Sequence, residues 1–297
     1  DSEVSHGKPF TEEEILKLKN KLNMQNEFLE FNEDVQEFVG KIVESRQNLI
    51  KEEKLRLEKY EQKFPDEYQK LNQFFEFGFN KVAVKHLEKF NKKNNLSTRE
   101  NNHLILNDIS HDVLNFMGGS ADVNTSSMVF LENEGYLNEN FANRNIHFGI
   151  REHSMAAISN GIALFGGMSA FCSCYLSFSD YLKPSLRMSA LMNLPVLYEF
   201  SHDNFLIGED GPTHQPVEQM VTLRATPNLA VFRPYNISEI LACLQAFKDA
   251  VSHNGPSIIL AYTPCVNHKI DMQNSFKQAS LATKSGYFNL ITYYDQK

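Results

Sequence analysis

The spacing of hydrophobic and polar positions changes along the chain. Up to about residue 96, apolar residues recur at helical spacing among Glu, Lys and Asn. Thr11 followed by Glu12–Glu14 is typical of a helix N-cap with acidic residues in the first turn. Leu55–Phe74 continues the helical spacing but contains Pro65, which predicts an interruption there. Residues 1–96 are therefore expected to form a mainly helical connector, because the heptad pattern of a coiled-coil interaction arm is not sustained.

Short apolar runs alternate with helical patterns from about residue 97 to residue 264. The predicted strands are Asn145–Ile150, Ala170–Tyr175, Pro195–Phe200, Leu229–Arg233 and Ser257–Tyr262. The predicted helices are Glu152–Leu164, Tyr181–Leu191, Gln215–Arg224 and Ile237–Val251. This alternation predicts an α/β domain over 97–264, a parallel sheet with helices on both faces. Residues 265–297 are expected to form a linker and the start of a truncated further domain.

Composition excludes several classes of protein. The 297 residues carry 29 Lys and Arg against 37 Asp and Glu, a formal net charge of −8, which disfavours general nucleic-acid binding. The longest apolar stretch, Ile162–Leu176, is too short and too interrupted to span a bilayer, and the acidic start is unlike a signal peptide. The four cysteines form no CxxC pair and are expected to be reduced thiols of a cytoplasmic protein.

Ionisable residues gather in the loops that follow the predicted strands. These segments are Gly149–His153, Ser201–Asp203 and Gly208–Pro216, with Gly118–Asp122 upstream. Each has a structural explanation when taken singly, such as Glu152 as a helix cap or His202 in an ordinary loop pair. Ligands of parallel sheets bind at the carboxyl ends of the strands, so the group as a whole favours a functional site. GxGxxG, GxxxxGK[ST], HExxH and GxSxG motifs are all absent.

Three segments resemble the pyrimidine-binding domain of transketolase. They are GIREHSMAAISN at 149–160, SHDNFLIGEDGPTHQP at 201–216 and GGSAD at 118–122. The resemblance implies the thiamine-diphosphate-binding fold and a transferase of the pentose phosphate pathway, which moves a two-carbon ketol unit between ketose and aldose phosphates. Two alternatives stay open. One is another thiamine-diphosphate enzyme, such as 1-deoxyxylulose-5-phosphate synthase or a split subunit; the other is an inactive fragment that supports dimerisation only.

The resemblance also implies roles for individual residues. Glu152 matches the catalytic glutamate beside the cofactor's pyrimidine ring. The remaining expected cofactor-binding residues are Asp122, Tyr175, Phe178 and Tyr181. His202, expected also to act in catalysis, and Asp210 match residues that bind sugar hydroxyls.

The expected pocket for the substrate phosphate consists of Arg99, Ser126 and His214. The family usually has a second arginine after the last strand, near Thr263. This sequence instead reads Tyr262-Thr263-Pro264-Cys265, so its phosphate pocket departs from the family pattern.

The family's Gly-Asp-Gly segment, which holds the cofactor diphosphate and its Mg²⁺ or Ca²⁺, does not occur in this sequence. The resemblance therefore implies that those ligands lie in a missing N-terminal domain and that this chain holds no metal ligand. Residues 1–96 would then be the connector after that domain. The implied partners are sugar phosphates and a second subunit, in a homodimer with the active site at the interface, or a complementary diphosphate-binding domain. Neither nucleic acid nor membrane is expected as a partner.

Overall fold

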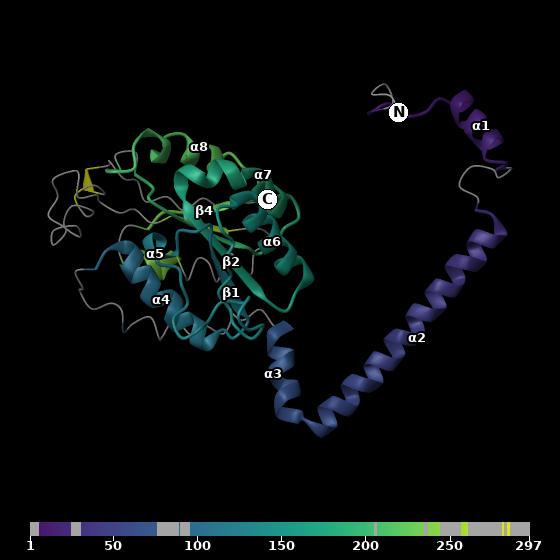
Figure 1. The fold of residues 1–297 in the computed structure, drawn as a ribbon, viewed down its shortest axis with the longest axis horizontal. Coiled ribbons are helices and arrows are strands. Elements are labelled where there is room, and N and C mark those ends of the chain that lie inside the picture. The colour runs from purple at the N-terminus through teal and green to yellow at the C-terminus, as the bar shows by residue number, and fades with distance from the viewer. Residues whose placement is uncertain are drawn as a thin grey trace. The chain divides into compact units, whose positions relative to one another are not determined.

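The computed structural model describes residues 6–24, 31–75, 89, 96–204, 207–234, 237–243, 257–260, 281 and 284–285. The chain divides into two compact units, residues 1–69 and 70–297, which are considered separately (Figure 1). Most of the predicted segment 265–297 and the region around Thr263 lie outside the described residues. The expected domain boundaries at 96 and 264 stay predictions.

The first unit consists of helices. They are α1 (Glu12–Lys21), α2 (Glu33–Lys63) and the start of α3 (Pro65–Phe75). Thr11 caps α1 as predicted, because its hydroxyl accepts from the amide of Glu14 and its own amide donates to the Glu14 carboxylate. The break at Pro65 is also confirmed. None of these helices has a buried residue, and nowhere in the described chain is a helix both long and apolar enough to cross a membrane.

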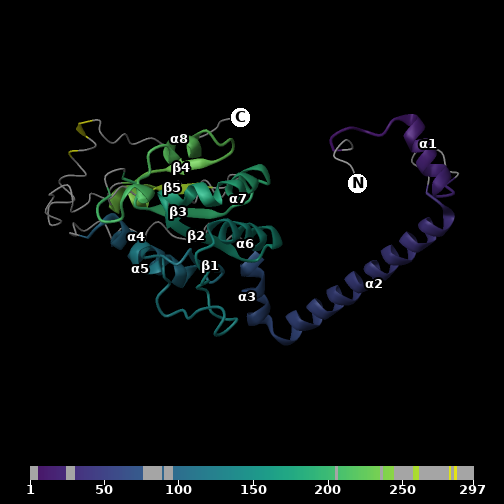
Figure 2. The same ribbon diagram turned by 45° about the horizontal axis from the view of Figure 1, so that its top comes forward.

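The second unit is built on a five-stranded parallel sheet (Figure 2). The strands are β1 (Phe116–Ser120), β2 (Ser169–Tyr175), β3 (Leu197–Ser201), β4 (Ala230–Phe232) and β5 (Ser257–Leu260). Their order is β1-β2-β3-β5-β4, so β5 lies between β3 and β4. The parallel α/β fold is confirmed, and four of the five predicted strands correspond to β2–β5.

The strand predicted at Asn145–Ile150 is wrong. The edge strand is β1, and Asn145 makes only isolated bridges, one of them to Gly118. The sequence hides β1 because it contains two glycines, which weaken a strand pattern. Both glycines are required because other backbone segments approach β1 closely. A Cβ at Gly118 would lie 2.0 Å from the Phe171 carbonyl oxygen, and a Cβ at Gly119 would lie 2.0 Å from the Ile146 carbonyl oxygen.

Helices cover both faces of the sheet. Their bounds are α4 (Thr98–Asp112), α5 (Asn124–Ser127), α6 (Glu152–Phe165), α7 (Ser179–Leu191) and α8 (Gln219–Arg224), with 3₁₀ helices η4 (Leu176–Phe178) and η5 (Pro212–His214). The predicted α6 and α7 are confirmed, while α8 begins four residues later than predicted. Gln215 is part of a loop and not of α8, because its side chain accepts from the amide of Ile207 and donates to the carbonyl oxygen of Ile207. Residues 237–243 are helical, and the rest of that predicted helix lies outside the described residues.

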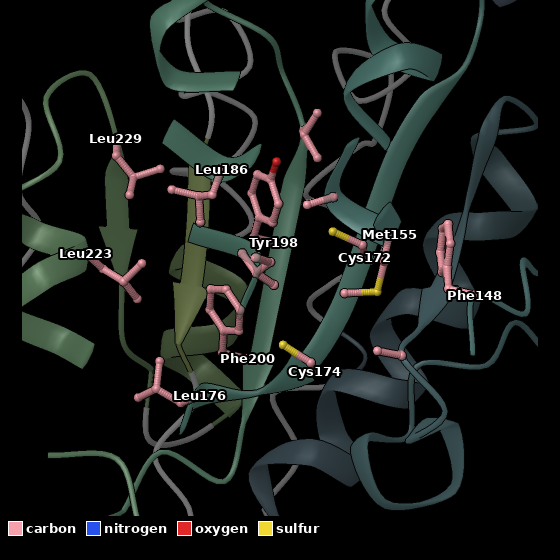
Figure 3. Close-up of a cluster of buried hydrophobic side chains, with 14 of the residues drawn as sticks. Phe148, Met155, Cys172, Cys174, Leu176, Leu186, Tyr198, Phe200, Leu223 and Leu229 are labelled. Atoms are coloured by element: carbon pink, nitrogen blue, oxygen red, sulfur yellow. The ribbon is translucent and has the colours of Figure 1, made fainter. Parts of the chain in front are cut away.

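The core has one apolar cluster on each face of the sheet. Residues of α4 pack with Phe116, Phe171 and Leu197 on one face. Residues of α6 and α7 pack on the other face with a second set of strand side chains, Cys172, Cys174, Tyr198 and Phe200 (Figure 3). Consecutive strand residues thus point to opposite faces, as a sheet buried on both sides requires.

Candidate functional site

Five ring side chains meet beyond the carboxyl ends of β2 and β3. We call the aromatic cluster the set Tyr175, Phe178, Tyr181, His202 and His214. The Tyr175 ring lies 3.8 Å from the His202 ring and 5.7 Å from the Phe178 ring, centroid to centroid, the latter pair nearly parallel. Phe178 in turn lies 6.0 Å from Tyr181 and 4.9 Å from His214. Residues predicted separately for cofactor and sugar therefore form one group.

Local backbone geometry places His202 in this cluster. His202 has a φ of 55°, in the left-handed region, where a residue other than glycine is under strain. It follows β3 directly, so the turn in the backbone carries the imidazole onto the face of Tyr175 at the end of β2. Burial lowers the pKa of His202 to about 4; Arg99 and His214 act in the same direction and Asp210 opposes it.

The expected phosphate-pocket residues join the cluster through Tyr175. The Tyr175 hydroxyl donates to the Ser126 hydroxyl oxygen at 2.6 Å. Arg99 donates from Nη1 to the Ser126 carbonyl oxygen at 3.1 Å. Arg99 stands in the first turn of α4, whose start is fixed by a capping box between Ser97 and Glu100. Arg99, Ser126, Tyr175 and His214 thus lie in one connected group.

Serines 127 and 201 extend this group into the interior. The Ser201 hydroxyl lies 2.9 Å from Nδ1 of His202 and 2.8 Å from the Ser127 hydroxyl. From the sequence, Ser127 was not selected at all, and Ser201 was named only as the first residue of the loop segment Ser201–Asp203 and of the motif at 201–216. Serine is common in loops and at strand ends, so the sequence contains no signal that distinguishes these two.

An ion pair fastens the loop that carries His202. Arg233, just after β4, donates from Nε to the Asp203 carboxylate at 2.7 Å and from Nη2 to the Asp203 carbonyl oxygen. The Asp203 side chain is fully buried. Because β5 separates β3 from β4, this pair ties together loops that follow two non-adjacent strands. Sequence analysis missed Arg233.

Glu152, Asp122 and Asp210 lie outside the aromatic cluster. Glu152 is the first residue of α6. Burial raises the pKa of the Cys174 thiol in β2, and the charges of Cys172 and then Glu152 add to the rise. The Glu152 carboxylate makes no hydrogen bond or ion pair with any residue that the structure describes. Asp122 is exposed, with its carboxylate 3.2 Å from Nε2 of His147. Asp210 is exposed, and its charge reaches His202.

The chemistry of these residues fits a flat heteroaromatic ring better than a metal ion. Within the described part of the chain, no three His, Cys, Asp or Glu side chains gather in a way that could hold a metal. Tyr181 leaves 64% of its surface exposed at the edge of the cluster, so the rings offer an open apolar face. A carboxylate without a protein partner at the first turn of α6 suits a ligand nitrogen that carries a proton.

Comparisons with known proteins agree with this geometry. Residues 94–264 match the family described as transketolase, pyrimidine binding domain. The chain is 34% identical over 251 residues to a transketolase of Bacillus subtilis, spanning 84% of this chain and 38% of that protein. A transketolase of Aquifex aeolicus is 34% identical over 262 residues, 88% of this chain and 37% of its own length.

Solved structures give the same result. A Campylobacter jejuni transketolase superposes with a TM-score of 0.74 at 34% identity, over 88% of this chain and 39% of that one. A Pichia stipitis transketolase in complex with sedoheptulose-7-phosphate superposes with a TM-score of 0.76 at 28% identity, over 87% and 39%. The chain spans less than two fifths of the length of these relatives. With its parallel sheet and the matched domain, this chain belongs to the transketolase family.

Proposed function

We propose that this chain supplies the pyrimidine side of a thiamine-diphosphate site and that the whole protein is a transketolase. That protein would transfer a two-carbon ketol unit from a ketose phosphate to an aldose phosphate, in the cytoplasm and within the pentose phosphate pathway. The observation that carries the proposal is the aromatic cluster at the end of β2, together with the Glu152 carboxylate at the start of α6, whose charge acts on Cys174 in the same strand. When bound, thiamine diphosphate supplies a thiazolium carbon that can be deprotonated and can carry the ketol unit.

Glu152 is the proposed acid–base residue. A carboxyl that shares a proton with a ring nitrogen favours one tautomer of an aminopyrimidine, and that tautomer can accept a proton from elsewhere in the cofactor. Two features support this role. The carboxylate has no competing protein partner in the described chain, and it stands at a helix N-terminus, where the helix dipole stabilises negative charge. Tyr175, Phe178 and Tyr181 of the cluster would hold the pyrimidine ring, and Asp122 would bind at the edge of that ring.

The second set of residues is proposed to bind the substrate. His202 and Asp210 would bind sugar hydroxyls, while Arg99, Ser126 and His214 would bind the phosphate. Support comes from the contacts that link Arg99 to Ser126 and Ser126 to Tyr175, because they place a guanidinium on the same edge as the rings. A single fixed guanidinium next to a hydroxyl suits a phosphate dianion.

A second copy of the chain is the proposed macromolecular partner, with Mg²⁺ or Ca²⁺ and the diphosphate held outside this chain. α6 and α7 pack on one another and still leave large apolar side chains exposed, among them Phe165 with 91% of its surface exposed. Ile158 and Leu164 on α6, and Met188 and Leu191 on α7, are exposed as well. Exposed apolar patches of this kind mark interaction surfaces.

The test is ketol transfer by the full protein that contains this chain, assayed with a ketose phosphate donor and an aldose phosphate acceptor. We expect turnover that depends on added thiamine diphosphate and a divalent cation. The 297-residue chain alone should bind the cofactor weakly in calorimetry, because the diphosphate and metal carry most of the charge. Synthase activity with pyruvate and glyceraldehyde 3-phosphate would replace the proposal by the synthase alternative. No turnover by the loaded full protein would support a non-catalytic dimerisation fragment instead.

A further inference from the structure

The side chains of Ser127, Ser201 and His202 form a line of hydrogen bonds that begins in the interior of the domain and ends at the imidazole. The Ser127 hydroxyl, at the end of α5, lies 2.8 Å from the Ser201 hydroxyl, at the end of β3. The Ser201 hydroxyl lies 2.9 Å from Nδ1 of His202. Ser127 is 0% exposed and Ser201 is 7% exposed, so bulk solvent does not reach their hydroxyls. Among the residues that the structure describes, neither hydroxyl has another side-chain hydrogen bond.

Counting protons along this line distinguishes its two possible directions. Each hydroxyl carries one proton to donate, and a neutral imidazole carries one N–H. If Ser127 donates to Ser201, and Ser201 donates to Nδ1 of His202, every buried donor has an acceptor. In the reverse direction, Nδ1–H donates to Ser201 and Ser201 donates to Ser127, which leaves the Ser127 proton buried without an acceptor. Such an unsatisfied buried donor costs about 1–3 kcal/mol, so the first direction is favoured.

We infer that Ser127 and Ser201 are positioning residues that hold His202 in its Nε2–H tautomer, so that the imidazole meets its ligand as a hydrogen-bond donor. The identity of that ligand rests on the proposed function, whereas the tautomer does not. Nε2 makes no hydrogen bond with any described residue, and the Tyr175 ring, whose centroid lies 3.8 Å from that of the imidazole, restrains it from one side.

The charge state of the imidazole agrees with this inference. The charged or titratable groups that act on His202 are Arg99, Asp210 and His214, and together with burial they give a pKa of about 4. At neutral pH the ring is therefore uncharged and carries a single proton, which the serine line assigns to Nε2.

This tautomer determines which ligand atoms His202 can bind. An Nε2–H group donates to oxygen atoms with free lone pairs, such as the hydroxyl or carbonyl oxygen of a sugar, and it cannot accept a proton at the same nitrogen. His202 is thus suited to orient an oxygen of the ketose donor rather than to act as a base toward it. A ligand that presents only donors, such as an ammonium group at that position, would be rejected.

Nitrogen NMR on the 297-residue chain tests the tautomer without any enzyme assay. The chain is labelled with ¹⁵N-histidine and measured at pH 7, and the His202 signals are assigned by their loss in His202→Gln. We expect a protonated Nε2 and an unprotonated Nδ1. The Nδ1–H form should become detectable in Ser201→Ala and stay absent in Ser201→Thr, which keeps the hydroxyl. Ser159→Ala removes another fully buried hydroxyl, bonded to Met155 in α6, and should change nothing.

Two results would overturn the inference: a protonated Nδ1 in the unaltered chain, or an unchanged tautomer ratio in a folded Ser201→Ala chain. If Ser201→Ala does not fold, as judged by near-ultraviolet circular dichroism, the unaltered chain and Ser201→Thr still decide the matter. In the full protein, Ser201→Ala should raise KM for the ketose donor by about two- to tenfold with a smaller change in kcat, the effect of one misdirected hydrogen bond. Full protein without ketol transfer but with the expected tautomer would remove the proposed function and leave the serine line intact.

Discussion

The two faces of the sheet are made from the same strands, yet their chemistry differs. On the α6–α7 face, β2 and β3 present apolar or aromatic side chains, namely Cys172, Cys174, Tyr198 and Phe200. On the α4 face, the apolar pair Phe171 and Leu197 is followed toward the carboxyl edge by Ser173 and Glu199. Ser120 of β1 lies in register with Ser173, so a buried polar row crosses three strands.

The two faces of the sheet therefore have different roles, one in packing and one in forming the candidate site. The α6–α7 face holds the domain together, because its strand side chains are apolar apart from the Tyr198 hydroxyl, and that hydroxyl is hydrogen-bonded to Asn160 and Ser189. Two residues further along β2 and β3, on the same face as this polar row, are Tyr175 and Ser201. These two are in register with each other and belong to the candidate site. Burying polar groups costs stability unless each is hydrogen-bonded. The structure therefore accepts a less stable face where the ligand site begins.

The largest effect is expected from truncation on the packing face. Phe200→Ala removes a side chain that is 1% exposed and should destabilise the domain by about 3–5 kcal/mol. Ser201→Ala, one residue away and on the other face, should cost less, about 1–3 kcal/mol, because it leaves the buried Ser127 hydroxyl without its acceptor. Urea unfolding, followed by near-ultraviolet circular dichroism of the buried tyrosine, measures both. Equal losses would contradict the division between the faces.

The next effect concerns the proposed acid–base residue at the carboxyl edge. Glu152→Gln in the full protein should reduce ketol transfer by about a hundredfold or more, because an amide cannot exchange a proton with the ring nitrogen. The free energy of unfolding should fall by no more than about 1 kcal/mol, since the carboxylate has no protein partner in the described chain and only its interaction with the helix dipole is lost. Glu218→Gln, at an exposed position before α8, is the control. Near-normal turnover would remove Glu152 from catalysis.

A smaller effect is expected at the phosphate end. Removing a charge-assisted partner of a phosphate costs roughly tenfold to several hundredfold in affinity, so Arg99→Ala should raise KM for phosphorylated sugars by that factor. Turnover of unphosphorylated hydroxypyruvate should stay nearly unchanged. Arg99→Lys keeps the charge without the planar fork and should recover part of the loss. Equal effects on both kinds of donor would show that Arg99 is a structural residue.

The packing face is where the sequence was most informative. The helical spacing of α6 and α7 and the apolar runs of β2 and β3 follow directly from burial on both sides of the sheet, and all four were predicted. β1 was missed because Phe116–Ser120 contains Gly118 and Gly119, whose value lies in close backbone approach and not in side-chain pattern. Residues 145–150 were predicted to be the strand instead, as one of the short apolar runs of this region.

The site was predicted only as far as residue type reveals function. Rings, carboxylates and imidazoles in the loops after strands could be selected from the sequence, and the structure joins most of them in one group. Ser127 and Arg233 could not be selected, because their roles depend on partners that lie far away in the chain. Ser127 reaches Ser201 across 74 residues and Arg233 reaches Asp203 across 30. Such contacts are a property of the fold.

Glu199 provides the last test of the comparison between the faces. It is 9% exposed in the middle of β3 and makes no salt bridge within the described chain. Burial raises the pKa of Glu199 to about 8, and the neighbouring Asn102 side chain opposes the rise. The native protein therefore keeps this proton up to about pH 8, whereas the unfolded chain releases it near the ordinary value of 4.5.

Because the native state binds more protons in that window, the free energy of unfolding should fall as pH rises through it. His202 has the opposite effect, but only between its native pKa of about 4 and its ordinary value of 6.5. From pH 6.5 to 8 the slope should thus reflect Glu199, at about 1.4 kcal/mol lost per pH unit. Glu199→Gln should remove this slope, whereas Glu218→Gln, at an exposed position, should keep it. Urea unfolding at a series of pH values measures it, and a flat profile in the unaltered chain would mean that Glu199 is ionised in the native state.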